Sequence, residues 1–286
     1  MTKTALHSLL ATIAITGSLA ATGLAATAGQ ARAAEELSVQ YDLYTRGMRA
    51  FALNYDARIE PAAYSARAKL RPKGLASLLV DVKMDMETAG TLTADGAIPR
   101  SFSMGINEDG KSGNYAVTFK GLKPASSKRD PGVNAEVAAK LDAASAKGVR
   151  DTLSSIMNMA VAAGGNPCNS NHRIYNGKEV FQLNLTKLKD DVFHNKDGGV
   201  YRGPAIACRL VYSTLAGLSP KSEAKYRKNP PTFNVWFAPV ESKSLGRPIN
   251  VLIGVSGQIK GKDFVAYANR ATINGKPFNA QSMASK

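Results

Sequence analysis

The chain has 286 residues, with 37 basic and 22 acidic side chains, so its net charge at neutral pH is +15. This length is enough for one large β domain or two small ones behind a leader segment. Two cysteines and three histidines give little material for a metal centre, which needs several such ligands at a regular spacing.

An N-terminal leader comes first. Lys3 precedes an apolar run over about residues 9–26, and Ala31-Arg-Ala33 matches the small-x-small pattern of a signal-peptide cleavage site. We therefore expect residues 1–33 to be a signal peptide, cut between Ala33 and Ala34, and the mature chain to be periplasmic. Glycines and hydroxyl side chains make the run too weakly apolar for a membrane span, so we do not expect an integral membrane protein. An uncleaved anchor is the alternative.

The mature chain keeps a large excess of basic residues. Removing a leader with Lys3 and Arg32 and no acid leaves 35 basic and 22 acidic side chains, a net charge of +13. This excess favours an anionic envelope component, such as lipid head groups or cell-wall polymers, or an envelope protein as partner. Nucleic acid is not expected, because the protein is exported and its basic residues form no patch interleaved with aromatic ones.

The first part of the mature region predicts an antiparallel meander. Apolar and polar residues alternate there with a period of two, which is typical of a sheet with one buried and one wetted face. The links between the runs are short. The alternating runs lie at residues 39–44, 51–60, 64–71, 80–87, 101–107 and 114–120.

A polar stretch at residues 123–132 predicts an exposed loop, and the only predicted helical region follows at about 134–163. Residues 135–146 are rich in alanine. From Val149 to Val161 the apolar residues recur at the spacing of an amphipathic helix. This region is expected as an insertion into a single β-rich domain spanning residues 34–286.

The second half returns to strands. Asn176-Gly177 is a strong hairpin turn pair between two of them, and residues 220–231 are basic and expected to be exposed. In total, the sequence predicts a mainly β fold of about 10–12 strands with one or two helices. A curled antiparallel sheet, a β-spiral or half-barrel, would hide the edges of so many strands. The predicted runs are 172–175, 180–185, 205–215, 233–237, 251–255 and 264–273.

One stretch matches the phosphate-binding P-loop pattern. Residues 105–112 read GINEDGKS. The phosphate-binding mechanism needs a helix after the loop, whereas residues 114–120 alternate as a strand. Glu108 and Asp109 would also place carboxylates where phosphate should bind. We expect a β-hairpin and no nucleotide.

The two cysteines, Cys168 and Cys208, are expected to form one structural disulfide, since the chain is exported. A nucleophilic pair of Cys168 and His172 is the alternative. His172 is expected on a strand face and His194 in a polar loop, with no metal-binding spacing between them. By strand alternation, the Trp236 side chain points to the face opposite that of Phe233, Val235 and Phe237. We expect it either to pack under the helix or to face a groove or a second layer. We expect no catalytic, cofactor-binding or metal-binding residue.

Several motifs together resemble a family of exported bacterial proteins known as domain of unknown function 3108. The cysteine-bearing segments are the most specific part. The resemblance spans nearly the whole mature chain and implies a periplasmic protein with no catalytic residues to carry over. Similar exported β proteins of alphaproteobacteria fold as a β-spiral and are linked to envelope integrity. The motifs are Tyr41-Asp-Leu-Tyr-x-x-Gly47, Gly74-Leu-x-x-Leu-Leu79, Pro167-Cys168, Arg173-Ile-Tyr-Asn-Gly177, Phe181-x-Leu183, Gly203-Pro-Ala-x-x-Cys208-Arg-x-x-Tyr212, Pro231 and Val235-Trp236-Phe-Ala238.

Three functions follow as hypotheses. The first is a non-enzymatic periplasmic protein that supports the cell envelope by binding an envelope component or a partner protein. The second is a carrier that holds a lipid or acyl chain within the half-barrel. The third is a hydrolase acting on cell-wall or lipid substrates, which would need a pair of acids clustered in a cleft.

Overall fold

The computed structural model describes residues 33–74, 77, 81–162, 165–194, 200–259 and 261–278. The predicted signal peptide lies outside these residues except for Ala33, so its cleavage between Ala33 and Ala34 stays a prediction. No described helix is long and apolar enough to cross a membrane.

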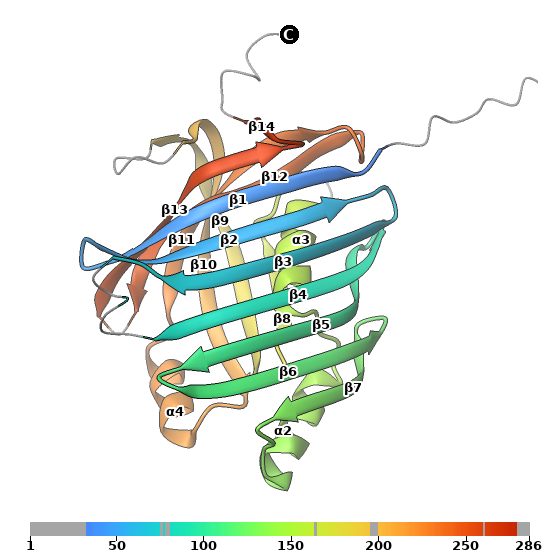
Figure 1. Cartoon of the computed structure of the whole chain (residues 1–286), viewed down its shortest axis with the longest axis vertical. Helices are drawn as coiled ribbons and strands as arrows, with labels where there is room; N and C mark the ends of the chain where they lie inside the picture. Colours follow the sequence, from blue (N-terminus) through green and yellow to red (C-terminus); the bar gives the residue numbers. More distant parts are fainter. Residues whose placement is uncertain are drawn as a thin grey trace, which may run out of the picture. The chain divides into compact units, whose positions relative to one another are not determined.

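The described strands form one antiparallel sheet of 14 strands (Figure 1). Its order is β7-β6-β5-β4-β3-β2-β1-β13-β12-β11-β10-β9-β8, with β14 paired to β13. Two meanders therefore meet where β1 pairs with β13. The strands are β1 (Glu35–Thr45), β2 (Met48–Ile59), β3 (Ala63–Pro72), β4 (Val82–Thr93), β5 (Gly96–Glu108), β6 (Lys111–Lys120), β7 (Lys123–Asp130), β8 (Ser170–Tyr175), β9 (Val180–His194), β10 (Arg202–Ala216), β11 (Thr232–Ser242), β12 (Arg247–Ile259), β13 (Lys262–Ile273) and β14 (Lys276–Pro277).

The expected loop at 123–132 is wrong, because most of it forms β7 at an edge of the sheet. This strand has no buried residue, and therefore no apolar alternation to reveal it. Its backbone pairs with β6, and the hydroxyls of Thr118 and Ser126 hydrogen-bond across the pair at 2.7 Å. Polar and basic side chains on an edge strand also discourage pairing with another chain.

The described residues contain three helices, α2 (Ala135–Ser145), α3 (Thr152–Ala160) and α4 (Pro220–Lys228). The first two lie within the predicted helical region. The third lies in the basic stretch that was expected to be exposed, and none of its residues is buried. Its start is marked by Ser219, whose side chain accepts a hydrogen bond from the Ser222 amide, and by Pro220 in the first turn.

Helix α3 lies inside the curled sheet. It packs against β3, β4 and β5 on one side and against β8 and β12 on the other, and Figure 1 shows it between the two layers of strands. Leu153 and Met157 on this helix are almost completely buried. A helix with 3.6-residue apolar periodicity thus fills the interior that the strands enclose.

The two edges of the sheet, β7 and β8, are bridged. Arg129 on β7 donates hydrogen bonds to the Tyr175 hydroxyl at 2.5 Å and to the Gly177 carbonyl at 3.0 Å. Between the edges, the Val149 amide donates to the Leu122 carbonyl at 2.7 Å. The predicted curled antiparallel sheet is confirmed, with 14 described strands and three described helices in place of the 10–12 and one or two expected.

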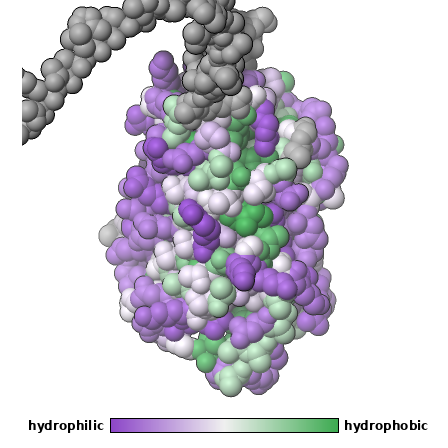
Figure 2. Space-filling view, turned by 90° about the vertical axis from the view of Figure 1, so that its right-hand side faces the viewer, coloured by the Kyte–Doolittle hydropathy of each residue, from purple (hydrophilic) through white to green (hydrophobic). Residues whose placement is uncertain are grey.

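The surface is mixed in polarity. On the face shown in Figure 2, hydrophobic residues form a central strip with hydrophilic residues on both margins. Large exposed hydrophobic side chains occur elsewhere as well, including Met48 at 58% and Val192 at 53% exposure. Scattered residues of this kind are ordinary on soluble proteins.

Candidate functional site

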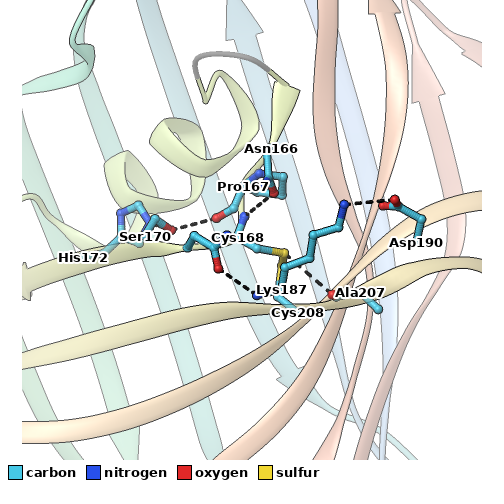
Figure 3. The surroundings of a disulfide bond; sticks show 10 residues. Asn166, Pro167, Cys168, Ser170, His172, Lys187, Asp190, Ala207 and Cys208 are labelled. Atoms are coloured by element: carbon cyan, nitrogen blue, oxygen red, sulfur yellow. Dashed lines mark hydrogen bonds and ion pairs between the residues drawn. A yellow bond between two sulfur atoms is a disulfide. The ribbon is translucent and has the colours of Figure 1, made fainter.

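The predicted disulfide is confirmed. Cys168, just before β8, is bonded to Cys208 on β10, with a Cα–Cα distance of 5.7 Å (Figure 3). Both residues are buried. The backbone around Cys168 is held in place by side chains, because its amide donates to Asn166 Oδ1 at 3.0 Å and the Lys187 amide donates to Asn169 Oδ1 at 3.1 Å. Since the Cys168 sulfur is bonded to Cys208, it offers no thiolate nucleophile to His172.

His172 lies on β8 with only 4% of its surface exposed. Its Nε2 is 2.9 Å from the Ser170 hydroxyl, whereas its Nδ1 is buried without a hydrogen-bond partner. Burial, assisted by the positive charge of Arg150, lowers the pKa of His172 to about 4. The imidazole is therefore neutral at pH 7 and belongs to the interior of the protein.

Asp151 anchors the start of α3 in a buried polar network. Its Oδ1 accepts the Ser154 amide at 2.9 Å, and its Oδ2 accepts the hydroxyls of Thr88, at 3.0 Å, and Ser154. The Tyr64 hydroxyl donates to the Ser154 hydroxyl at 2.7 Å. Burial raises the pKa of Asp151, and these hydrogen bonds oppose that rise. The carboxylate caps the helix and has no adjacent imidazole of the kind that hydrolytic triads use.

The P-loop match is a β-hairpin, as expected. Residues 105–112 span the end of β5 and the start of β6, and these strands pair directly. Asp109 and Gly110 have φ angles of +50° and +78°, as a type I′ hairpin turn requires. The helix N-terminus that phosphate binding needs is therefore replaced by a strand.

The other singled-out residues are spread over the sheet. His194 ends β9 and is exposed, so it lies in a strand and not in a loop. Trp236 is half-buried, with its ring 5.6 Å from that of Phe193 on β9. Within the described residues, no three histidine, cysteine or acidic side chains gather as metal ligands would.

Several acids of the first meander are held in surface ion pairs. Asp85 pairs with Arg71 at 2.7 Å, and Asp56 pairs with Arg67 at 3.3 Å. The ion-paired Asp56 lines an open groove of about 650 Å³ over β1–β6. Carboxylates that pair with arginines on an exposed face are ordinary solvated charges and contribute little to stability.

An apolar cavity of about 270 Å³ lies between α3 and strands β8–β13. Ten of its lining residues are apolar side chains from the strands, and α3 adds Ile156, Met159 and two hydroxyl residues, Thr152 and Ser155. Several of the strand residues, such as Leu210 and Val255, are only half-buried. The cavity is thus an open, apolar space of the kind in which proteins bind small molecules.

One end of the cavity leads to helix α4. Phe181 in the cavity wall stacks on Tyr212 with ring centroids 5.3 Å apart, and Tyr212 meets Tyr226 of α4 at 5.8 Å. A second groove, of about 550 Å³, is lined by Lys225 and Tyr226. The two spaces share no lining residue but lie on neighbouring strands, because Phe233 of the cavity wall pairs with Gly257 of the groove.

The sequence did not reveal this cavity. Its lining residues occupy ordinary inward-facing positions on several strands. The alternation of apolar and polar residues shows which side chains face the interior, but it does not show whether the helix fills that interior completely. Ser155 could have been noticed as a hydroxyl on the apolar side of the predicted helix. It is fully buried, and its hydroxyl has no hydrogen-bond partner.

The chain is similar to one protein family and to several solved structures. A family model described as a protein of unknown function, DUF3108, matches residues 40–260. A beta-barrel-like protein of domain of unknown function DUF1849 from Brucella abortus has 10% sequence identity and a TM-score of 0.45, over 84% of this chain and 98% of that chain. A candidate lipoprotein from Parabacteroides distasonis has 10% identity and a TM-score of 0.33, over 84% and 96%. No curated protein matches the sequence.

Proposed function

The chain belongs to the DUF3108 family, and we propose that it is a non-enzymatic periplasmic protein that supports the integrity of the cell envelope by binding an anionic envelope component or an envelope protein. A disulfide between buried cysteines supports an oxidising, extracytoplasmic location. The leader sequence supports export to the periplasm.

The observation that carries the binding part of the proposal is helix α4. All of its side chains are solvent-accessible, and its last turn contains Lys225, Arg227 and Lys228. These three cations have no carboxylate partner within ion-pair distance among the described residues. An unneutralised cluster of this kind attracts polyanions, whereas cations already paired with acids contribute little.

The non-enzymatic part is supported by the roles of the buried reactive groups. Cys168 is held in the disulfide, His172 is neutral inside the protein, and Asp151 caps α3. Each therefore has a structural role that accounts for its position.

Deletion of the gene tests the proposal. We expect the deletion strain to become sensitive to detergents and cell-wall drugs and the wild-type protein to restore resistance. A Lys225→Glu/Arg227→Glu/Lys228→Glu variant should restore it poorly. Reversal of the same charge on β6 and β7, in Lys111→Glu/Lys120→Glu/Lys123→Glu, is the matched control and should complement. A deletion strain as resistant as its parent would end the proposal.

A second candidate function, a carrier for a lipid or acyl chain, is favoured by the apolar cavity beside α3. A protein of this kind should retain its ligand during gentle purification. Native mass spectrometry of protein purified from its own periplasm, followed by lipid extraction, should then find a bound acyl compound. A mass equal to that of the mature chain alone would count against the carrier function.

A further inference from the structure

We propose that the cavity between α3 and β8–β13 binds a single acyl chain of about ten carbons, with the anionic head of the ligand at the basic helix α4. The inference rests on the carrier function and deepens it.

The size of the cavity sets the length of the chain. An apolar protein cavity of about 150 Å³ accommodates benzene, with its six carbons. On that scale the cavity of about 270 Å³ holds about ten carbons of one chain. A phospholipid with two long chains is too large, because drug-sized and larger ligands occupy pockets of about 300–1,000 Å³.

The position of helix α4 sets the direction. At the inner end, Met159 and Phe237 belong to the apolar cluster that surrounds the disulfide. Thr152 lies at the other end. Arg150, two residues before it, forms a β-bridge with Ile174 on β8, and Ile174 pairs with Phe181 on β9. Phe181 leads through Tyr212 to α4. The methyl end of a chain is therefore favoured near Met159, and the polar end near α4.

The wall of the cavity is almost entirely apolar. Ser155 belongs to this wall, but the residue is completely buried and its hydroxyl lies beneath the apolar surface. Only the chain of a ligand is therefore favoured inside the cavity, and its polar head is expected outside it.

The charge outside the cavity complements an anionic head. The nearby groove is lined by Lys225 and by the segment Asn229–Thr232. Lys225 belongs to the last turn of α4, which also carries Arg227 and Lys228. Fatty acids and monoacyl phospholipids share this chemistry, one chain with an anionic head, and both are sources of the ligand.

Calorimetric titration of the purified protein with fatty acids of increasing length tests the proposal. The affinity should rise about fourfold per methylene from hexanoate to decanoate, the value expected when each methylene leaves water. It should then level off between decanoate and tetradecanoate, when the cavity is full. No binding of any acid, or a rise that continues through tetradecanoate, would overturn the proposal.

A Val255→Trp variant fills the cavity from the strand side. We expect decanoate affinity to fall at least tenfold, while the folded state, checked by circular dichroism, is kept. The matched control is Leu188→Trp, which adds the same ring at a residue that is 43% exposed and does not line the cavity. Equal decanoate affinity in the two variants would place the binding site elsewhere.

Charge substitutions test the orientation. Lys225→Glu should weaken decanoate more than uncharged decanol, and Lys69→Glu, on the exposed side of β3, should change neither. If decanol and decanoate respond alike to Lys225→Glu, the head is not at α4.

The two sources are separated by comparing dodecanoate with a dodecanoyl lysophosphatidylglycerol. Binding of both identifies a monoacyl membrane lipid as a ligand, and binding of dodecanoate alone identifies free fatty acid. Failure of both contradicts the inference. A lipid that co-purifies with the protein but is insensitive to Val255→Trp would contradict this site while leaving the carrier function intact.

Discussion

His172 makes the stability of the folded protein depend on pH. Its imidazole is buried, and its Nδ1 has no partner to stabilise a proton. The folded-state pKa of about 4 lies below the ordinary value of 6.5. The unfolded state therefore binds more protons in this interval, so stability is fully present above pH 6.5 and is lost as the pH falls toward 4.

We expect this loss to amount to about 3 kcal/mol between pH 7 and pH 4, and His172→Gln to abolish it. Urea denaturation at several pH values measures the difference between wild type and variant, in which the contributions of other groups cancel. His194→Gln, at an exposed histidine, is the control and should behave as wild type. An unchanged pH dependence in His172→Gln would contradict the assignment.

Asp151 and Asn134 have the same local role in different surroundings. Each accepts a hydrogen bond from a backbone amide in the first turn of its helix, Ser154 for Asp151 and Val137 for Asn134. Asp151 is fully buried and also accepts the Thr88 and Ser154 hydroxyls.

Asp151→Ala should therefore reduce the free energy of unfolding by about 3 kcal/mol, because it leaves several buried donors unpaired. Asn134→Ala removes only an exposed cap and should cost about 1 kcal/mol. Chemical denaturation of the two variants gives both values. Equal costs would mean that the buried network around Asp151 contributes nothing beyond capping.

At the scale of elements, the disulfide joins the segment before β8 to the middle of β10 across a separation of 40 residues. A cross-link of this length restricts the unfolded chain and stabilises the folded state by roughly 4 kcal/mol in the chain-entropy model. Both cysteines are buried, so reductant reaches them only when the chain opens.

A Cys168→Ser/Cys208→Ser variant should lose roughly this stability, and reduced wild type should melt at the same temperature as the variant. Thiol labelling of the unfolded but unreduced wild-type protein should detect no free cysteine. Detection of two reactive thiols there would show that the bond is absent from the purified protein.

The seam between β7 and β8 holds the two ends of the sheet together. Arg129 is 12% exposed in its side chain and hydrogen-bonds to Tyr175 and Gly177 across the seam. Its guanidinium also lies 5.8 Å from the Tyr175 ring. Removing this residue leaves the Tyr175 hydroxyl and the Gly177 carbonyl with fewer partners.

Arg129→Met should cost about 2 kcal/mol of stability and increase hydrogen exchange in β7 and β8. Arg67→Met, at an arginine whose ion pair is exposed, should cost less than about 0.5 kcal/mol. Exchange that rises equally over the whole sheet in Arg129→Met would indicate general destabilisation without a role in closing the seam.

For the whole molecule, the alternation of residues was enough to predict a curled antiparallel sheet, and the spacing from Val149 to Val161 was enough to predict the helix that fills it. The edge strand β7 escaped prediction because an edge strand with no buried residue carries no alternation. Helix α4 escaped because it buries no residue and so has no apolar face to mark it.

The candidate site was predicted only in part. The disulfide followed from two cysteines in an exported chain, because a pairing between two residues has one solution. The cavity depends on how α3 packs against strands that are distant in the sequence, and this information is in no single segment. The position of Lys225 near the cavity likewise follows only from the packing of α4 in the folded chain.

The most direct test compares cavity-filled and wild-type protein in the deletion strain. The carrier function predicts that wild type and Leu188→Trp restore resistance to detergents and cell-wall drugs, and that Val255→Trp fails although it folds and accumulates to the same level. That result would connect the cavity beside α3 to the support of the envelope. Full restoration by Val255→Trp would contradict this connection and leave the surface of the protein as the site of its function.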